Sequence, residues 1–147
     1  MCDILTCESL TKCYGAKTAL DSMDLHIGLG KIVGLLGPNG SGKTTLIKLA
    51  NGLLQPTGGS IRIAGMKPGV ESKAIVSYLP DADWLPDWMR VEQLVELFTD
   101  FYKDFDPARA NEMLAKLNLQ PKAALKTLSK GNKEKVQLIL AMSRNAR

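Results

Sequence analysis

A glycine-rich segment is the part of this sequence whose residue types could do chemistry most directly. It reads Gly37, Pro38, Asn39, Gly40, Ser41, Gly42, Lys43, Thr44 and Thr45. Two glycines with four residues between them, followed by lysine and threonine, fit the G-x-x-x-x-G-K-[ST] pattern of phosphate-binding loops. Glycines let the backbone curl so that successive N–H groups face inward around an anion. The segment therefore predicts a site for the phosphates of a nucleotide.

Three side chains of this segment have distinct expected roles. Lys43 would reach the β- and γ-phosphates, and the hydroxyl of Thr44 would ligate Mg²⁺. Thr45 is placed for the α-phosphate side. A helix that follows such a loop presents its positive end to the phosphates. The expected ligand is a nucleoside triphosphate with Mg²⁺.

The segments on either side of the loop have the pattern that this geometry requires. Residues 31–36 form an apolar run, which predicts a strand buried on both faces of a sheet. Apolar residues at helical spacing predict a helix over residues 43–54, stopped by Pro56 and the glycines after it. Further strands are expected at residues 4–10, 20–27, 60–64 and 74–79.

Beyond Pro80 the pattern changes from strands to helices. Apolar residues at helical spacing begin at Val91, and a third helix is expected to begin near Ser129. Between them, Asp106 followed by Pro107 predicts a helix N-terminus with a cap and a proline at the first position. We expect an α/β chain, with residues 1–80 as a nucleotide-binding core and residues 81–147 as a helical part.

Composition narrows the function classes. The chain has 147 residues, of which 45% are hydrophobic and 23% charged, typical of a soluble globular protein. It has no apolar run of membrane-spanning length and no signal-peptide pattern at its start, so a cytoplasmic location is expected. The net charge is +4, but aromatics are not interleaved with the basic residues, so no nucleic acid partner is expected. Three cysteines without a CxxC pair and one histidine argue against a zinc-type site.

Three segments together resemble the ATP-binding subunit of an ABC transporter. The exact sequence of the phosphate loop, residues 37–45, is common in that family. Residues 11–15, around Tyr14, resemble its adenine-stacking loop, and residues 128–132 resemble its signature, usually written LSGGQ. The resemblance covers nearly the whole chain and implies a P-loop NTPase fold of ABC type. That fold has a mixed sheet with an antiparallel β subdomain, and an α-helical subdomain.

The resemblance also implies roles for residues outside the loop. Tyr14 would stack on the adenine of ATP, although a tyrosine at a strand end can also simply pack on the core. Ser129, Gly131 and Asn132 would contact the γ-phosphate of ATP held by a second copy, although Ser129 can also serve only as a helix cap. Lys130 and Asn132 depart from the usual glycine and glutamine of the signature.

Asp81 stands where the family has the glutamine of its Q-loop. A carboxylate there could approach Mg²⁺ and the attacking water, which would make Asp81 both catalytic and a metal ligand. It could equally be a loop residue without a ligand. Trp84 and Trp88 follow it, and they would either form a docking surface for a membrane partner or pack under the helical part.

The family also has a strand ending in Asp-Glu and a later histidine. Here no apolar run is followed by Asp-Glu, and the only histidine, His26, lies before the phosphate loop. We therefore expect a domain truncated before the Walker B strand, which binds ATP without efficient turnover. Its uncovered apolar surface would lead to self-association or to a mobile helical part. Alternatively, Asp81 could itself be the Walker B aspartate of a small P-loop kinase.

The leading functional hypothesis is an ATPase motor that couples ATP binding and hydrolysis to transmembrane export. Its partners would be transmembrane permease subunits and a second ATPase subunit, in a homo- or heterodimer on the cytoplasmic face of the membrane. Export rests on a weaker likeness to bacterial drug and peptide exporters. The alternative is an ABC-type ATPase of translation or DNA repair, but residues 91–125 are too few for the long coiled coil expected there.

Overall fold

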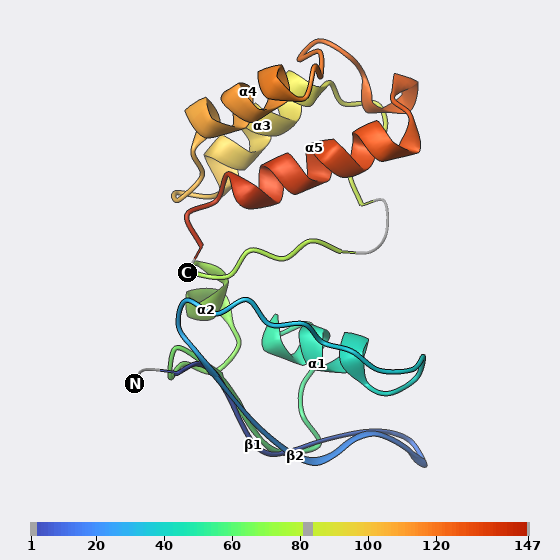
Figure 1. The fold of residues 1–147 in the computed structure, drawn as a ribbon, viewed down its shortest axis with the longest axis vertical. Helices are drawn as coiled ribbons and strands as arrows, with labels where there is room; N and C mark the ends of the chain where they lie inside the picture. The colour runs from blue at the N-terminus through green and yellow to red at the C-terminus, as the bar shows by residue number, and fades with distance from the viewer. Residues whose placement is uncertain (1–2, 81–83, 147) are drawn as a thin grey trace. The chain divides into compact units, whose positions relative to one another are not determined.

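The computed structural model describes residues 3–80 and 84–146, and the chain divides into two compact units between Val76 and Ser77 (Figure 1). In chain order the elements are β1 (Asp3–Tyr14), β2 (Lys17–Gly28), α1 (Lys43–Ala50), β3 (Gly58–Ile63), α2 (Val70–Lys73), α3 (Val91–Phe101), α4 (Pro107–Lys116), a 3₁₀ turn (Leu125–Thr127) and α5 (Lys130–Met142). Each unit has its own hydrophobic core. No helix described within these residues is both long and apolar enough to cross a membrane.

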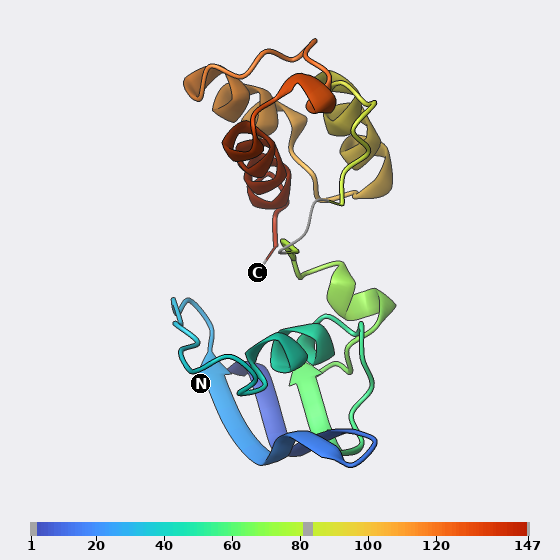
Figure 2. The same ribbon diagram turned by 90° about the vertical axis from the view of Figure 1, so that its right-hand side faces the viewer.

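The first unit is a three-stranded antiparallel sheet with one helix packed against it. The strand order is β2-β1-β3, so β1 is central. Figure 2 shows α1 lying across one face of these strands. Leu46 and Leu49 of α1 pack against Cys7 and Leu10 of β1, and all four are buried. The expected strands at residues 4–10, 20–27 and 60–64 are confirmed, although β1 and β2 are longer than predicted.

An extra residue in β1 at Ser9 changes which side chains face the helix. Ser9 has φ of +45°, and the pairing with β2 is irregular between Cys7 and Leu10. The backbone N–H of Ser9 donates to the Asp24 carboxylate (2.6 Å). Strict alternation would place Cys7 and Leu10 on opposite faces, but this bulge brings both into the core against α1.

The strand predicted at residues 31–36 is wrong, because this segment forms no regular structure. Ile32 and Leu36 are almost fully exposed, at 105% and 92% of their reference areas. A strand buried on both faces needs hydrogen-bonded neighbours, and within the described residues no strand pairs with this segment.

The strand predicted at residues 74–79 is also wrong. The N–H groups of Ala74 and Ile75 donate to the carbonyls of Glu71 and Ser72, so they continue the turn of α2 and cannot join a ladder.

The helix predicted over residues 43–54 ends earlier than expected, at Ala50. Gly52 has φ of +65°, and the N–H groups of Gly52 and Leu53 donate to the carbonyls of Leu49 and Lys48. This is the Schellman pattern that terminates helices at glycine. Gly52, rather than Pro56, therefore ends the helix.

The second unit is a bundle of α3, α4 and α5, as the helical spacing predicts (Figure 1). Its core includes Leu94 and Phe98 of α3, Leu114 of α4 and Ile139 of α5. The predicted start of α4 is confirmed, since Asp106 accepts a hydrogen bond from the N–H of Arg109 (3.0 Å) and proline follows it.

Candidate nucleotide-binding site

At the last turn of the glycine-rich segment before α1, the backbone conformation and the packing both require glycine. Gly42 has φ of +90° and caps the helix. A Cβ atom at Gly42 would lie 2.5 Å from the carbonyl oxygen of Ala19 and 2.7 Å from a methyl group of Leu20. The loop therefore packs directly against β2, and any side chain at Gly42 would push the two apart.

Lys43 folds back over the segment that precedes it. Its Nζ donates to the carbonyl oxygens of Gly37 (2.8 Å) and Pro38 (2.7 Å) and to Oγ of Ser41 (3.3 Å). These contacts hold the ammonium group of Lys43 against the backbone of the loop. An ammonium group there can exchange neutral carbonyl partners for phosphate oxygens, with which its hydrogen bonds are stronger.

The N-terminus of α1 offers further donors. Its cap, Gly42, has no side chain to bond the first helical N–H groups. The first intrahelical bond into the cap is from Leu46 N–H to Gly42 O (2.9 Å), so the N–H groups of residues 43–45 precede the helical ladder. Such N–H groups, with the helix dipole behind them, favour a bound anion.

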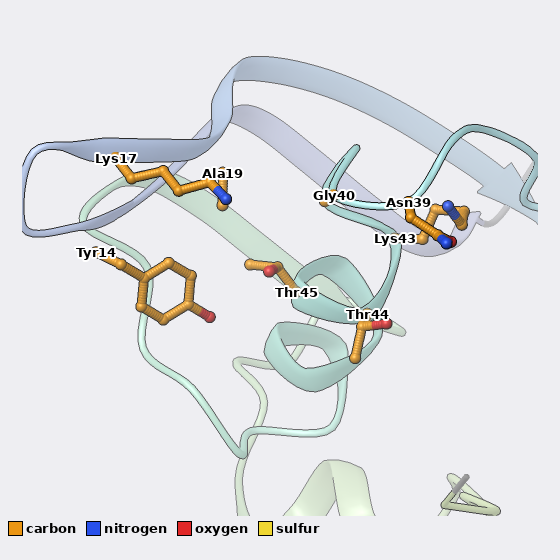
Figure 3. A pocket seen from close by; sticks show the side chains of 9 residues that line it. Tyr14, Lys17, Ala19, Asn39, Gly40, Lys43, Thr44 and Thr45 are labelled. Carbon is orange, nitrogen blue, oxygen red and sulfur yellow. The ribbon is translucent and has the colours of Figure 1, made fainter.

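A cavity of about 330 Å³ connects the loop to the tip of the β1–β2 hairpin. It is lined by Tyr14, Lys17, Ala19, Asn39, Gly40, Gly42, Lys43, Thr44 and Thr45. Figure 3 shows Tyr14 and Lys17 toward one end and Asn39, Gly40 and Lys43 toward the other, with Thr44 and Thr45 on α1. An aromatic ring at one end and an anion-binding loop at the other suit an elongated ligand with a base and phosphates.

Tyr14 is not buried in the core, since 47% of its surface is exposed. Its ring lines the cavity, and Nζ of Lys12 lies 5.4 Å from the ring centroid. Exposed aromatic surface in a ligand cavity is suited to stacking on a nucleobase.

Six of the nine loop residues predicted to bind phosphate line this cavity, and the other three do not. Gly37, Pro38 and Ser41 instead provide the partners of Lys43.

Lys17 was not among the predicted site residues. The antiparallel pairing of β1 and β2 places it directly across from Tyr14. A hairpin drawn with its turn at Gly15 would have revealed this pairing from the sequence.

The signature-like residues lie in the second unit, at the N-terminus of α5. Ser129 is the N-cap, and its Oγ accepts a hydrogen bond from the N–H of Asn132 (3.3 Å). Ser129, Lys130 and Gly131 are exposed. This arrangement leaves the first turn of α5 accessible to an anionic group.

The remaining candidates are the Q-loop segment and its tryptophans. Asp81 lies outside the described residues. The ring of Trp84 lies 5.9 Å from that of Phe98 and so packs beside the helical core, whereas Trp88 is 73% exposed. The two tryptophans therefore differ in their surroundings.

The hydroxyl oxygen of Thr44 at the loop is compatible with a Mg²⁺ site. Among the described residues, no group of three or more His, Cys, Asp and Glu side chains could hold an ion. Mg²⁺ commonly keeps several waters and binds through substrate phosphates with only one or two protein ligands. The exposed hydroxyl of Thr44 on the cavity is compatible with that pattern.

Comparisons with known proteins agree with this geometry. Residues 20–147 match the ABC transporter family. The SkfA peptide export ATP-binding protein SkfE of Bacillus subtilis is 32% identical over 149 residues, covering 97% of this chain and 62% of that protein. The daunorubicin resistance ATP-binding protein DrrA3 of Streptomyces coeruleorubidus is 35% identical over 121 residues, covering 78% and 38%.

A solved structure described as the ATP binding subunit of an ABC transporter superposes with a TM-score of 0.83 at 27% identity. The match covers 94% of this chain and 61% of that one. The chain spans between 19% and 62% of the length of the first curated relatives it matches. With the P-loop fold and the sequence matches in agreement, the chain belongs to the ABC transporter family of ATP-binding proteins.

Proposed function

We propose that this chain is the ATP-binding part of an ABC transporter ATPase subunit, which couples ATP binding and hydrolysis to export across a membrane. The observation that carries the proposal is the cavity that Tyr14 shares with residues of the loop and of α1, namely Asn39, Gly40, Gly42, Lys43, Thr44 and Thr45. We assign the binding step to this chain and hydrolysis to the whole protein. Family membership argues against the small P-loop kinase considered from the sequence.

Each part of the cavity has a role in the proposal. Tyr14 stacks on adenine, and the N–H groups of the loop and of the first turn of α1 hold the phosphates. Lys43 leaves its loop carbonyls to bind the β- and γ-phosphates. Thr44 would ligate Mg²⁺, which would neutralise charge on the phosphate oxygens. Asp81 is proposed to approach the metal and the attacking water.

The partners are part of the same proposal. Two ATPase subunits would each complete the other's site, with Ser129, Gly131 and Asn132 contacting the γ-phosphate of ATP on the neighbouring copy. The exposed first turn of α5 supports this role. Transmembrane permease subunits are the proposed second partner, with the motor at the cytoplasmic face of the membrane. Export is supported by the relative whose name describes peptide export.

A non-transport ABC-type ATPase is the second candidate. A translation or DNA-repair ATPase would bring a long coiled coil within its helical part. Here α3 and α4 have 11 and 10 residues and pack into a compact bundle. Recovery of the full-length protein with ribosomes or DNA, and not with membranes, would favour this alternative.

Titration of the chain with a fluorescent ATP analogue and Mg²⁺ tests the binding step. Lys43→Ala is expected to weaken binding at least tenfold, because it removes the phosphate-facing cation. Lys48→Ala is the matched control, since Lys48 is exposed in the last turn of the same helix. Because Lys43 also braces the loop, Thr44→Ala serves as a second variant, expected to reduce the Mg²⁺-dependent part of the affinity. Unchanged affinity in both variants would refute the proposal.

A further inference from the structure

The side chain of Lys12 makes two specific contacts, one with the ring of Tyr14 and one with the backbone of Gln55. Its Nζ lies 5.4 Å from the centroid of the Tyr14 ring, within the range of a cation–π interaction. The same Nζ donates to the carbonyl oxygen of Gln55 at 2.7 Å. Gln55 lies in the segment between α1 and β3. The ammonium is thus held between the ring of Tyr14 and the backbone that follows the helix.

Lys12 reaches the Tyr14 ring from the same strand, β1. Lys12 and Tyr14 are two residues apart on β1, so their side chains leave the same face of the strand. Tyr14 lines the cavity, but Lys12 is not among the described residues that do. Lys12 therefore contacts the ring without lining the cavity, and Tyr14 is 47% exposed, so part of its surface remains available to a ligand.

We propose that Lys12 is a positioning residue for base binding, which holds the Tyr14 ring from behind while its other face receives the adenine. This inference rests on the proposed function, specifically on stacking by Tyr14. A half-exposed tyrosine at a hairpin end can adopt several rotamers, and only those that present a ring face to the cavity are useful. If Tyr14 already occupies one of these rotamers before the ligand arrives, less side-chain entropy is lost on binding.

The size of the effect follows from the type of contact. Cation–π interactions at exposed sites correspond to about a two- to fivefold change in an equilibrium constant. The effect should appear only for ligands that carry a base, because the ring plays no part in holding phosphates. A general effect of positive charge would appear for phosphates alone as well.

The experiment compares Mg·ATP with Mg·tripolyphosphate as ligands of the full chain by calorimetry. Lys12→Ala is expected to weaken ATP binding about two- to fivefold and to leave tripolyphosphate affinity unchanged. Lys12→Arg should retain ATP affinity, since a guanidinium can both stack on the ring and donate to Gln55. In the Tyr14→Ala background, Lys12→Ala should have no further effect. Lys48→Ala again controls for the loss of one positive charge.

Three results would overturn the inference: unchanged ATP affinity in Lys12→Ala, an equal loss for both ligands, or the full Lys12→Ala effect in the Tyr14→Ala background. The proposed function fails separately. If Lys43→Ala and Thr44→Ala bind ATP normally, the phosphate site is refuted. If Tyr14→Ala weakens ATP while Lys12→Ala does not, only the role of Lys12 is lost.

Discussion

Replacing Gly42 with alanine should destabilise the first unit through two separable effects. A residue other than glycine in a left-handed backbone conformation costs about 1–2 kcal/mol. The new Cβ would also meet the Ala19 carbonyl oxygen at 2.5 Å and a Leu20 methyl group at 2.7 Å. Leu20 is part of the buried core, so relieving this overlap costs about a further 1–3 kcal/mol. The sum, roughly 2–5 kcal/mol, is a large fraction of the stability of a small domain.

Gly40 provides the matched control for this prediction. It lies in the same loop with φ of +84°, but a Cβ there would meet no atom within 4 Å. Gly40→Ala should therefore cost only the conformational part, about 1–2 kcal/mol. Restriction of the unfolded chain favours both alanine variants equally and cancels in the comparison. Urea unfolding followed by far-UV circular dichroism gives the two free energies. Equal losses in Gly42→Ala and Gly40→Ala would refute the claim that the loop packs against β2.

Three other perturbations have outcomes that follow from contacts in the structure. Arg144→Ala should lower the free energy of unfolding by about 3 kcal/mol, measured in urea, because it removes the bidentate partner of the largely buried Asp104 carboxylate. Burial raises the pKa of the Cys7 thiol above its ordinary 9.0. The unfolded chain therefore loses this proton first, so the contribution of Cys7 to stability should be constant below about pH 9 and fall above it, as unfolding at several pH values would show. Replacing Ile32 and Leu36 together with lysine should reduce self-association in sedimentation velocity without loss of stability, because both side chains are exposed.

Each of these expectations has a contradicting result. Arg144→Lys keeps the charge but not the two-pronged geometry, so a variant as stable as wild type would show that the geometry contributes nothing. An identical decline in stability above pH 9 in Cys7→Ala would assign the decline to another group. Self-association that is as strong in the double lysine variant would mean that the exposed run is not responsible.

The parts of the fold that could be predicted are those determined by local patterns. The phosphate loop combines glycines at positions with positive φ, a lysine and an adjoining helix, all within nine residues. The cap at Asp106 with Pro107 is equally local, and it forms as predicted. Tyr14 could be placed near the ligand only through the family likeness, because its distance from the loop in sequence carries no geometric information.

The wrong predictions have non-local causes. The run at residues 31–36 has strand-forming residues, but a strand also needs neighbours, and composition does not report whether they exist. The contribution of Lys17 depends on pairing across the hairpin. The end of α1 at Gly52 could have been recognised, since glycine just past the last apolar turn is a common stop signal.

The extra residue at Ser9 sets the phase of β1 for everything that follows it. In a chain one residue shorter at this point, Cys7 and Leu10 could not both face the core. Either Cys7 would turn out of the core, or Leu10 and Tyr14 would turn away from α1, and Cys13 would then face the cavity in place of the tyrosine. The residues of every sequence motif would be unchanged in such a deletion variant. Homologues that differ in length within this strand can therefore share the complete set of motifs and still differ in what they present to the nucleotide base.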